Sequence, residues 1–151
     1  MTQAFISCKG SFSATDVELP PLKPHDLRVK VEAVSVNPVD VKVAESLTEP
    51  RILGFDAAGT VTDVGSAVTL FAPGDEVFYV GSIDRPGANQ RLHTVDERIA
   101  GPRPESLSHA DAASLPLTSI TAWECLFDRL QLRPESTGTL LVIAPVGEWG
   151  R

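Results

Sequence analysis

Prolines and glycines are distributed along the whole chain, and this limits how long its helices and strands can be. The 151 residues include 12 prolines and 11 glycines, which do not cluster in one segment. Proline ends helices and interrupts hydrogen-bonded strands, and glycine favours turns. We therefore expect many short strands joined by turns, packed around one core.

The charge and the apolar segments of the chain exclude several function classes. The chain has 13 Lys and Arg against 20 Asp and Glu, a net charge of −7, whereas a nucleic-acid-binding surface needs excess positive charge. No apolar stretch approaches the roughly 20 residues that span a bilayer. The first ten residues lack the apolar region of a signal peptide. We therefore expect a cytoplasmic protein without nucleic-acid or membrane partners.

The cysteines and histidines do not form a recognisable metal site. Cys8 and Cys125 are far apart and neither belongs to a CxxC motif, so we expect two reduced, packed thiols. His25, His93 and His109 are scattered along the sequence. We expect each histidine to be a surface or packing residue, because a structural zinc site needs four closely spaced ligands.

The clearest strand is Leu27–Ala33, in which apolar and polar residues alternate, so that one face is buried and the other is solvated. It ends at Asn37-Pro38, because proline donates no backbone hydrogen bond. Further strands are expected at Ala4–Ile6, Val17–Leu19, Glu76–Val80 and Gln90–Val95. The run Ile52–Val64 carries Gly54 and Gly59 and contains the β-branched residues Thr60-Val61-Thr62.

The pattern changes from strands to helices near Ser108. A helical turn is already expected at Val39–Ala44, and Ser108 with Asp111 fits a capping box at a second helix start. Thr118–Leu130 has apolar residues at helical spacing. Leu140–Ala144 is a continuous apolar run, typical of a parallel strand buried on both faces.

A glycine-containing turn follows this last strand. Gly147 and Gly150 are three residues apart, a spacing that lets the backbone approach a pyrophosphate at a helix N-terminus. An ordinary glycine turn is the alternative. Pro145 removes a donor N–H and Glu148 adds a negative charge. We therefore interpret the turn as evidence of descent from a cofactor-binding enzyme more than of cofactor binding by this chain.

Six short motifs occur in one order along the chain. They are Asn37-Pro38-Val39-Asp40, Gly54-Phe55-Asp56-Ala57-Ala58-Gly59-Thr60-Val61, Val64-Gly65, Pro73-Gly74-Asp75-Glu76-Val77-Phe78, Ala112-Ala113-Ser114-Leu115-Pro116 and Thr121-Ala122-Trp123. In this order they resemble the medium-chain dehydrogenase/reductase superfamily, closest to its quinone-reductase-like and zinc-type alcohol-dehydrogenase-like branch.

The resemblance implies a mixed α/β, β-rich fold. Residues 1–116 would form a GroES-like, partly open β-barrel that carries the substrate side of the active site. Residues 117–136 would be a connecting helix. Residues 137–151 would be the truncated start of a Rossmann domain, limited to its first strand and part of a turn.

The zinc-type members of the superfamily have a cysteine at the position of Asn37 and a histidine at that of Phe55. Neither residue of this chain is a thiolate or imidazole ligand, and Asp56 alone does not hold zinc. We therefore predict no zinc. Asp56 and Gly59 are interpreted as structural: a buried carboxylate that accepts backbone N–H groups, and a glycine that allows close approach.

By resemblance, Asn37 and Asp40 line the catalytic cleft, and Thr121 contacts the nicotinamide ring. Without zinc, catalysis would depend on hydrogen bonds to the developing oxyanion or enolate. Structural roles remain open for all three residues: Asn37 as a cap before Pro38, Asp40 as an acid at a helix start, and Thr121 in a bond within its own helix.

Two functions follow from this sequence. The first is the N-terminal domain of a zinc-independent oxidoreductase that uses NADPH on quinones, enones or related carbonyl compounds, inactive as a fragment. The second is a non-catalytic GroES-like remnant or partner-binding module, which self-associates through the strand 140–144. The sequence does not distinguish NADP from NAD and does not identify the substrate.

Overall fold

The computed structural model describes residues 1–142, which fall into two units. The first is Met1–Ile120, and the second begins at Thr121. The strands are β1 (Thr2–Cys8), β2 (Ser11–Val17), β3 (Asp26–Ser35), β4 (Arg51–Ile52), β5 (Asp56–Val64), β6 (Glu76–Val80), β7 (Leu92–Asp96) and β8 (Ala100–Pro102). The helices are α1 (Pro38–Ser46), a 3₁₀ turn (Glu97–Ile99), α2 (His109–Ala113) and α3 (Pro116–Trp123), which continues as a π-helix (Glu124–Arg129).

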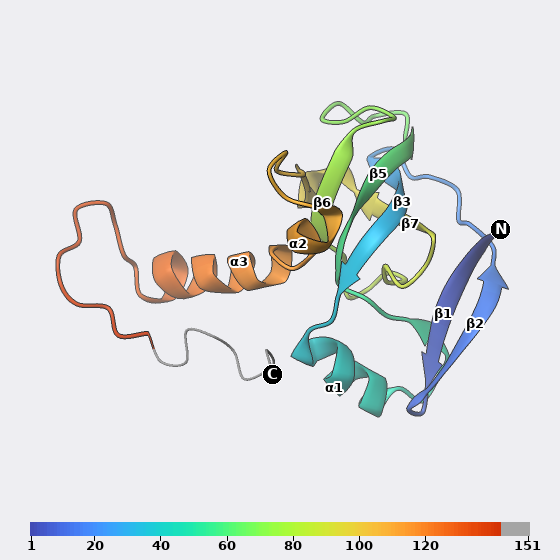
Figure 1. Cartoon of the computed structure of the whole chain (residues 1–151), viewed down its shortest axis with the longest axis horizontal. Helices are drawn as coiled ribbons and strands as arrows, with labels where there is room; N and C mark the ends of the chain where they lie inside the picture. Colours follow the sequence, from blue (N-terminus) through green and yellow to red (C-terminus); the bar gives the residue numbers. More distant parts are fainter. Residues whose placement is uncertain (143–151) are drawn as a thin grey trace. The chain divides into compact units, whose positions relative to one another are not determined.

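The strands form two open antiparallel sheets (Figure 1). The larger has the order β7-β3-β5-β6-β8, and the smaller has the order β2-β1-β4. An isolated bridge between Ala4 of β1 and Gln90, which precedes β7, and a hydrogen bond from the Leu92 N–H to the Thr2 hydroxyl join the two sheets. The chain is therefore mixed α/β and strand-rich, as predicted, with an open rather than a closed barrel.

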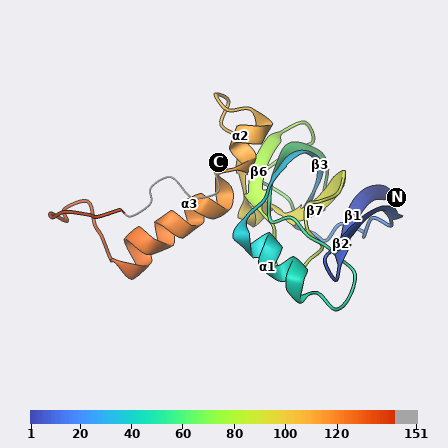
Figure 2. The ribbon, with the colours of Figure 1, turned by 60° about the horizontal axis from the view of Figure 1, so that its bottom comes forward.

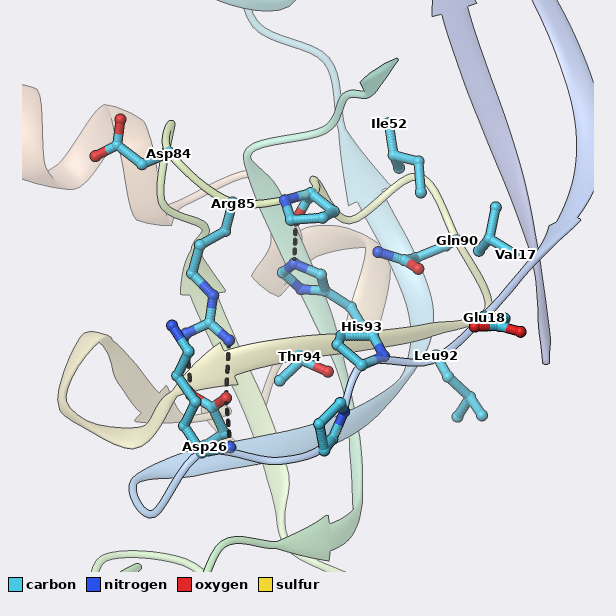
Figure 3. Close-up of a pocket in the computed structure, with 14 residues that line it drawn as sticks. Val17, Glu18, Asp26, Ile52, Asp84, Arg85, Gln90, Leu92, His93 and Thr94 are labelled. Atoms are coloured by element: carbon cyan, nitrogen blue, oxygen red, sulfur yellow. Dashed lines mark hydrogen bonds and ion pairs between the residues drawn. The ribbon is translucent and has the colours of Figure 1, made fainter. Parts of the chain in front are cut away.

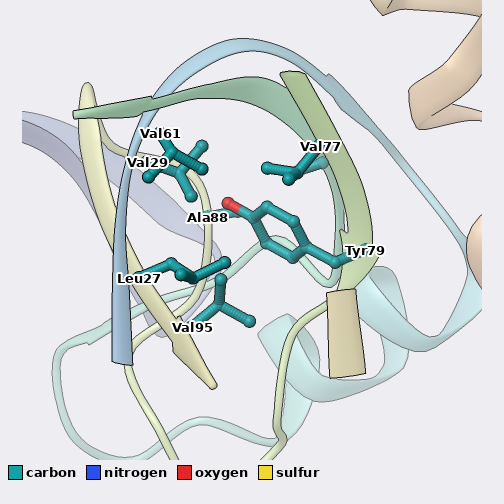
Figure 4. Packing of buried hydrophobic residues seen from close by; sticks show 8 residues of the cluster. Leu27, Val29, Val61, Val77, Tyr79, Ala88 and Val95 are labelled. Carbon is teal, nitrogen blue, oxygen red and sulfur yellow. The ribbon is translucent and has the colours of Figure 1, made fainter. Parts of the chain in front are cut away.

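The core lies on one face of the larger sheet. Leu27 and Val29 are fully buried, while the intervening Arg28 is not, which confirms the alternation predicted for this strand. The Tyr79 ring lies among the aliphatic side chains of neighbouring strands (Figure 4). The buried members of this cluster are Leu27, Val29, Ala57, Val61, Val77, Tyr79, Ala88 and Val95.

The opposite face of β5 is covered by α2. Ala58 packs with Ala112 and Ala113, and all three are fully buried. Small side chains let the helix approach the sheet closely. The predicted cap is confirmed, because the Ser108 hydroxyl oxygen accepts a hydrogen bond from the Asp111 backbone N–H.

Gly59 occupies the closest approach between two central strands. It pairs with Val31 where the register between β3 and β5 shifts. A Cβ atom at Gly59 would lie 2.1 Å from the backbone oxygen of Lys30. The predicted role of Gly59 in close approach is therefore confirmed.

One prediction about the strands was wrong in part. The strand expected at Val17–Leu19 is instead β2, which ends at Val17. The sequence of β2 is polar and mostly exposed, so it lacks an apolar alternation. The run Ile52–Val64 is divided between β4 and β5 by Gly54, whose φ of +99° breaks the extended backbone.

The second unit is helical where it begins. The rings of Trp123 and Phe127 are in contact one turn apart, with centroids 4.5 Å apart and planes tilted by 55°, and both side chains are exposed. Cys8 and Cys125 are free thiols, but Cys125 is exposed rather than packed as expected.

The strand predicted at Leu140–Ala144 is not seen in the described residues. Leu140–Val142 have no strand partner, and Ile143 and Ala144 lie outside the described part. A parallel strand forms only against neighbouring strands, and none of the described strands lies beside this one. None of the helices in residues 1–142 is long and apolar enough to cross a membrane.

We expect Gly59→Ala to destabilise the sheet by about 1–3 kcal/mol, because the new methyl group must displace backbone atoms. Urea unfolding monitored by far-UV circular dichroism measures the change in the free energy of unfolding. Gly81→Ala is the matched control, since its Cβ would meet nothing closer than 3.5 Å. Equal unfolding midpoints for the two variants would contradict this explanation of Gly59.

Candidate functional site

Asp56 is the centre of a buried polar cluster at the start of β5. Its side chain is fully buried. One carboxylate oxygen, Oδ2, accepts a hydrogen bond from Asn37 Nδ2 at 2.9 Å, and the other accepts one from the Leu117 backbone N–H at 2.9 Å. The carboxylate therefore connects β5 to the beginnings of α1 and α3.

β3 leads into α1 through a short connection (Figure 2). Asn37 and Asp40 lie together at the start of this helix. Asn37 is the N-cap residue, and Pro38 follows in the first turn, where its missing N–H costs nothing. Only the Asp40 half of a capping box is formed, since the Asn37 side chain makes no cap hydrogen bond. Asp40 Oδ2 accepts the Asn37 backbone N–H at 2.8 Å, while the Asp40 N–H donates to the Asn37 backbone carbonyl. The Asn37 side chain instead donates to Asp56.

The two carboxyl groups of the cluster have different surroundings. Burial raises the pKa of Asp56, and the negative charge of Asp40 raises it further, although the hydrogen bonds from Asn37 and Leu117 act in the opposite direction. Asp40 Oδ1 is buried and has no hydrogen-bond partner among the described residues. Both carboxylate oxygens of Asp56 therefore accept hydrogen bonds, whereas Asp40 has one oxygen without a hydrogen-bond donor among the described residues.

This cluster has the groups that hydrogen-bond catalysis needs. An amide N–H aimed at a developing negative charge stabilises a transition state in a site that excludes water. Asn37 has two N–H bonds on Nδ2, of which Asp56 uses one. The second N–H donates to no residue that the structure describes.

A separate pocket lies between the β2–β3 loop and the loop before β7 (Figure 3). Its volume is about 450 Å³, and Asn37 and Asp40 do not line it. Arg85 forms two hydrogen bonds to Asp26, each of 2.9 Å. Asp26 is almost fully buried, so this ion pair fastens the loop that carries Arg85 to the start of β3.

His93 contacts the loop that carries Arg85, through the backbone carbonyl of Pro86. Its Nε2 lies 3.0 Å from the Pro86 carbonyl and its Nδ1 lies 2.9 Å from the Tyr79 hydroxyl. Burial lowers the pKa of His93 to about 4, so the ring is neutral at pH 7, with Nε2–H donating to Pro86 and Nδ1 accepting from Tyr79. Since His93 is buried in this network, the structure supports its predicted role in packing.

The structure brings together only some of the predicted site residues. Asn37 and Asp40 lie side by side, and Asp56, interpreted as structural, joins them. Thr121 is the first residue of the second unit. Gly147 and Gly150 lie outside the described residues. The sequence did not predict that the backbone N–H of Leu117 belongs to this cluster. Pro116 could have indicated it, because proline is favoured at the first position of a helix, where backbone N–H groups are free to bind a carboxylate.

The family model of the alcohol dehydrogenase GroES-like domain matches residues 23–103, more than half of the chain. The chain belongs to this family. Its GroES-like region contains β3 to β8 and the cluster around Asp56, and the predicted membership of the medium-chain dehydrogenase/reductase superfamily is confirmed.

The relatives of this GroES-like chain are longer proteins. It is 50% identical over 109 residues to a zinc-type alcohol dehydrogenase-like protein of Staphylococcus aureus, covering 71% of this chain and 33% of that protein. An alcohol dehydrogenase superfamily protein from Novosphingobium aromaticivorans is 34% identical, with a TM-score of 0.83 over 88% of this chain and 43% of its own. A quinone oxidoreductase from Pseudomonas syringae is 27% identical, with a TM-score of 0.78 over 89% and 43%. The chain thus spans less than half the length of these relatives.

The names of some relatives include zinc, but the residues of this GroES-like chain do not fit that metal. The Asn37 amide is already bound to Asp56, and the Phe55 side chain has no donor atom. Among residues 1–142, no three His, Cys, Asp or Glu side chains are grouped so that they could hold a metal ion. A lone carboxylate is a poor match for tetrahedral nitrogen and sulfur ligation.

We expect Arg85→Leu to destabilise the chain by about 3 kcal/mol at pH 7, because it leaves the buried Asp26 carboxylate without its partner. Arg98→Leu is the matched control. It removes a cation from the more exposed pair with Asp96, and such surface pairs contribute little to stability. Urea unfolding of both variants measures the difference.

The penalty of Arg85→Leu should also depend on pH. Burial alone would raise the pKa of Asp26, but the hydrogen bonds and charge of Arg85 outweigh burial and hold it below the ordinary value of 3.8. The stabilisation is therefore complete above pH 3.8 and is lost as pH falls through the lower folded-state pKa. A penalty that stays constant down to pH 2 would contradict this assignment.

Proposed function

We propose that this chain is the substrate-side domain of a zinc-independent NAD(P)H-dependent oxidoreductase that acts on quinones, enones or related carbonyl compounds. The proposal rests above all on the amide of Asn37. Its position at the start of α1, its bond to Asp56 and its remaining N–H suit it to bind a substrate oxygen. The likeness to a quinone oxidoreductase supports the substrate class.

In this proposal a reduced nicotinamide, when bound, supplies a hydride to the substrate. Gly147 and Gly150, the glycines predicted to bind the cofactor, lie outside the described residues. Asn37 Nδ2 donates a hydrogen bond to the carbonyl oxygen of the substrate. Negative charge grows on that oxygen as hydride reaches the carbon, so the bond strengthens in the transition state and lowers the barrier.

Asp40 would complete the polar side of this site. Its Oδ2 fixes the backbone of Asn37 at 2.8 Å, and its unpaired Oδ1 is an acceptor. We propose that Asp40 accepts a hydrogen bond from a hydroxyl or water in the cleft, and that Thr121 contacts the nicotinamide ring. A site built this way needs no metal to polarise the substrate.

The experiment is a chimera in which residues 1–136 of this chain replace the corresponding part of the Novosphingobium protein. We expect the chimera to oxidise NADPH with at least one member of a panel of quinones and enones. Asn37→Ala should lower kcat by about a hundredfold, the usual effect of removing one oxyanion donor. The decrease of NADPH absorbance with time measures the rates.

Gln3→Ala removes an exposed amide away from the cluster and is expected to leave kcat unchanged. The 151-residue chain alone should give no turnover, since the proposed cofactor domain accounts for most of the relatives' remaining length. A chimera that binds NADPH but reduces no compound of the panel would refute the proposed function.

A second candidate function is a partner-binding module without catalysis. The observation that favours it is the apolar surface of the second unit, where Trp123 is 64% exposed and Leu141 is 79% exposed. Exposed apolar side chains in series are typical of association surfaces. In this alternative, residues 140–144 pair with a second copy or another chain.

Light scattering after size exclusion tests the second candidate. If the surface mediates self-association, the mass should rise with concentration, and Trp123→Gln with Leu141→Gln should return the chain to a monomer. Val17→Gln is a control outside this surface. A monomer at every concentration would exclude self-association through this surface.

A further inference from the structure

We infer that Asp56 is a positioning residue, which holds the Asn37 amide so that its NH₂ group, and not its oxygen, serves as the substrate-facing donor. The inference rests on the proposed function for its catalytic meaning. Its structural content, the orientation of one amide, is testable in the chain itself. It gives Asp56 a role beyond accepting backbone N–H groups.

The orientation of the amide follows from what each partner can accept or donate. An ionised carboxylate only accepts hydrogen bonds. Asp56 Oδ1 is used by the Leu117 N–H and Oδ2 faces Asn37, so the Asn37 atom that faces Oδ2 must be the nitrogen. The amide oxygen then lies on the side of the amide away from Asp56, and it makes no cap hydrogen bond at the start of α1.

The carboxylate itself has little freedom to turn. Asp56 lies on a strand flanked on both sides, opposite Ser35 of β3 and Val80 of β6. Its second oxygen is held by the backbone of Leu117. Since both the strand and the helix start fix it, Asp56 acts as a rigid acceptor for the amide of Asn37.

The charges around Asp56 determine how secure this orientation is. Asp40 is the charged residue that acts on Asp56 from α1. The neighbours across the sheet, Ser35 and Val80, are uncharged, and the contact from α3 is a backbone N–H. A proton on Asp56 would turn its Oδ2 into a donor, and the Asn37 amide would have to invert.

Asp56→Asn produces the same inversion without a change of shape. The new amide must keep its oxygen on the Leu117 N–H, so its NH₂ group faces Asn37. Asn37 then turns its own oxygen inwards. The side-chain NH₂ resonances of Asn37 in ¹⁵N–¹H correlation spectra of the 151-residue chain report this change.

In the wild-type spectrum, we expect one Asn37 side-chain proton to lie downfield of the other, because a carboxylate accepts it. In Asp56→Asn this separation should collapse, while the backbone N–H of Leu117 stays hydrogen-bonded and protected from exchange with solvent. Asp63→Asn, an exposed change on the same strand, should alter neither. An unchanged Asn37 NH₂ pair in Asp56→Asn would overturn the inference whether or not the protein is an enzyme.

The exchanged pair Asn37→Asp with Asp56→Asn separates positioning from stability. It restores a hydrogen bond between an NH₂ group and a carboxylate, now with the donor on residue 56. We expect it to recover much of the unfolding midpoint lost in Asp56→Asn, yet to leave the chimera as inactive as Asn37→Ala, because residue 37 has no donor. Recovery of kcat in the exchanged pair would contradict the inference.

A double-mutant cycle in the chimera gives the remaining measurement. Asp56→Asn should lower kcat by about a hundredfold in the wild-type background and by less than twofold in the Asn37→Ala background, because Asp56 acts through Asn37. Equal losses in both backgrounds would show that Asp56 acts independently of Asn37. An inactive parent chimera would count against the proposed function alone, and the spectra would still decide the inference.

Discussion

The burial of the Asp56 carboxylate is the constraint on which the candidate site depends. A carboxylate without water is tolerated only when hydrogen bonds replace its hydration. Here the donors come from Asn37 at the start of α1 and from Leu117 at the start of α3. Satisfying one buried charge therefore fixes where two helices begin relative to the central strand β5. The same requirement orients the amide that we propose as the catalytic donor.

Local patterns made much of the fold predictable. The strand around Leu27 and Val29 was correct because alternation depends only on which face is buried, and the cap at Ser108 was correct because it joins residues three apart. The strand at Ser11–Val17 was missed in most of its length. This polar strand is stabilised by backbone pairing with β1. Backbone pairing leaves no pattern of apolar residues in the sequence, so the strand could not be predicted from such a pattern.

The candidate site was predictable only to the same local extent. Asn37 and Asp40 are three residues apart at one helix start, so their proximity could be inferred from the sequence. The bond from Asn37 to Asp56 spans 19 residues and that from Leu117 spans 61. Such contacts depend on the packing of the sheet and not on spacing. Asp56 was correctly expected to accept a backbone N–H, but its bond to the Asn37 side chain gave no signal in the sequence.

The cluster also explains how the fold accommodates an amide at position 37 and a phenyl ring at position 55. Phe55 is almost fully buried beside Asp56, so an apolar side chain at this position is stabilised by packing. An amide at position 37 needs an acceptor once it is buried, and Asp56 provides one at 2.9 Å. The acidic residue on β5 thus makes a buried amide at position 37 compatible with the fold, because this hydrogen bond replaces the hydration that the amide loses on burial.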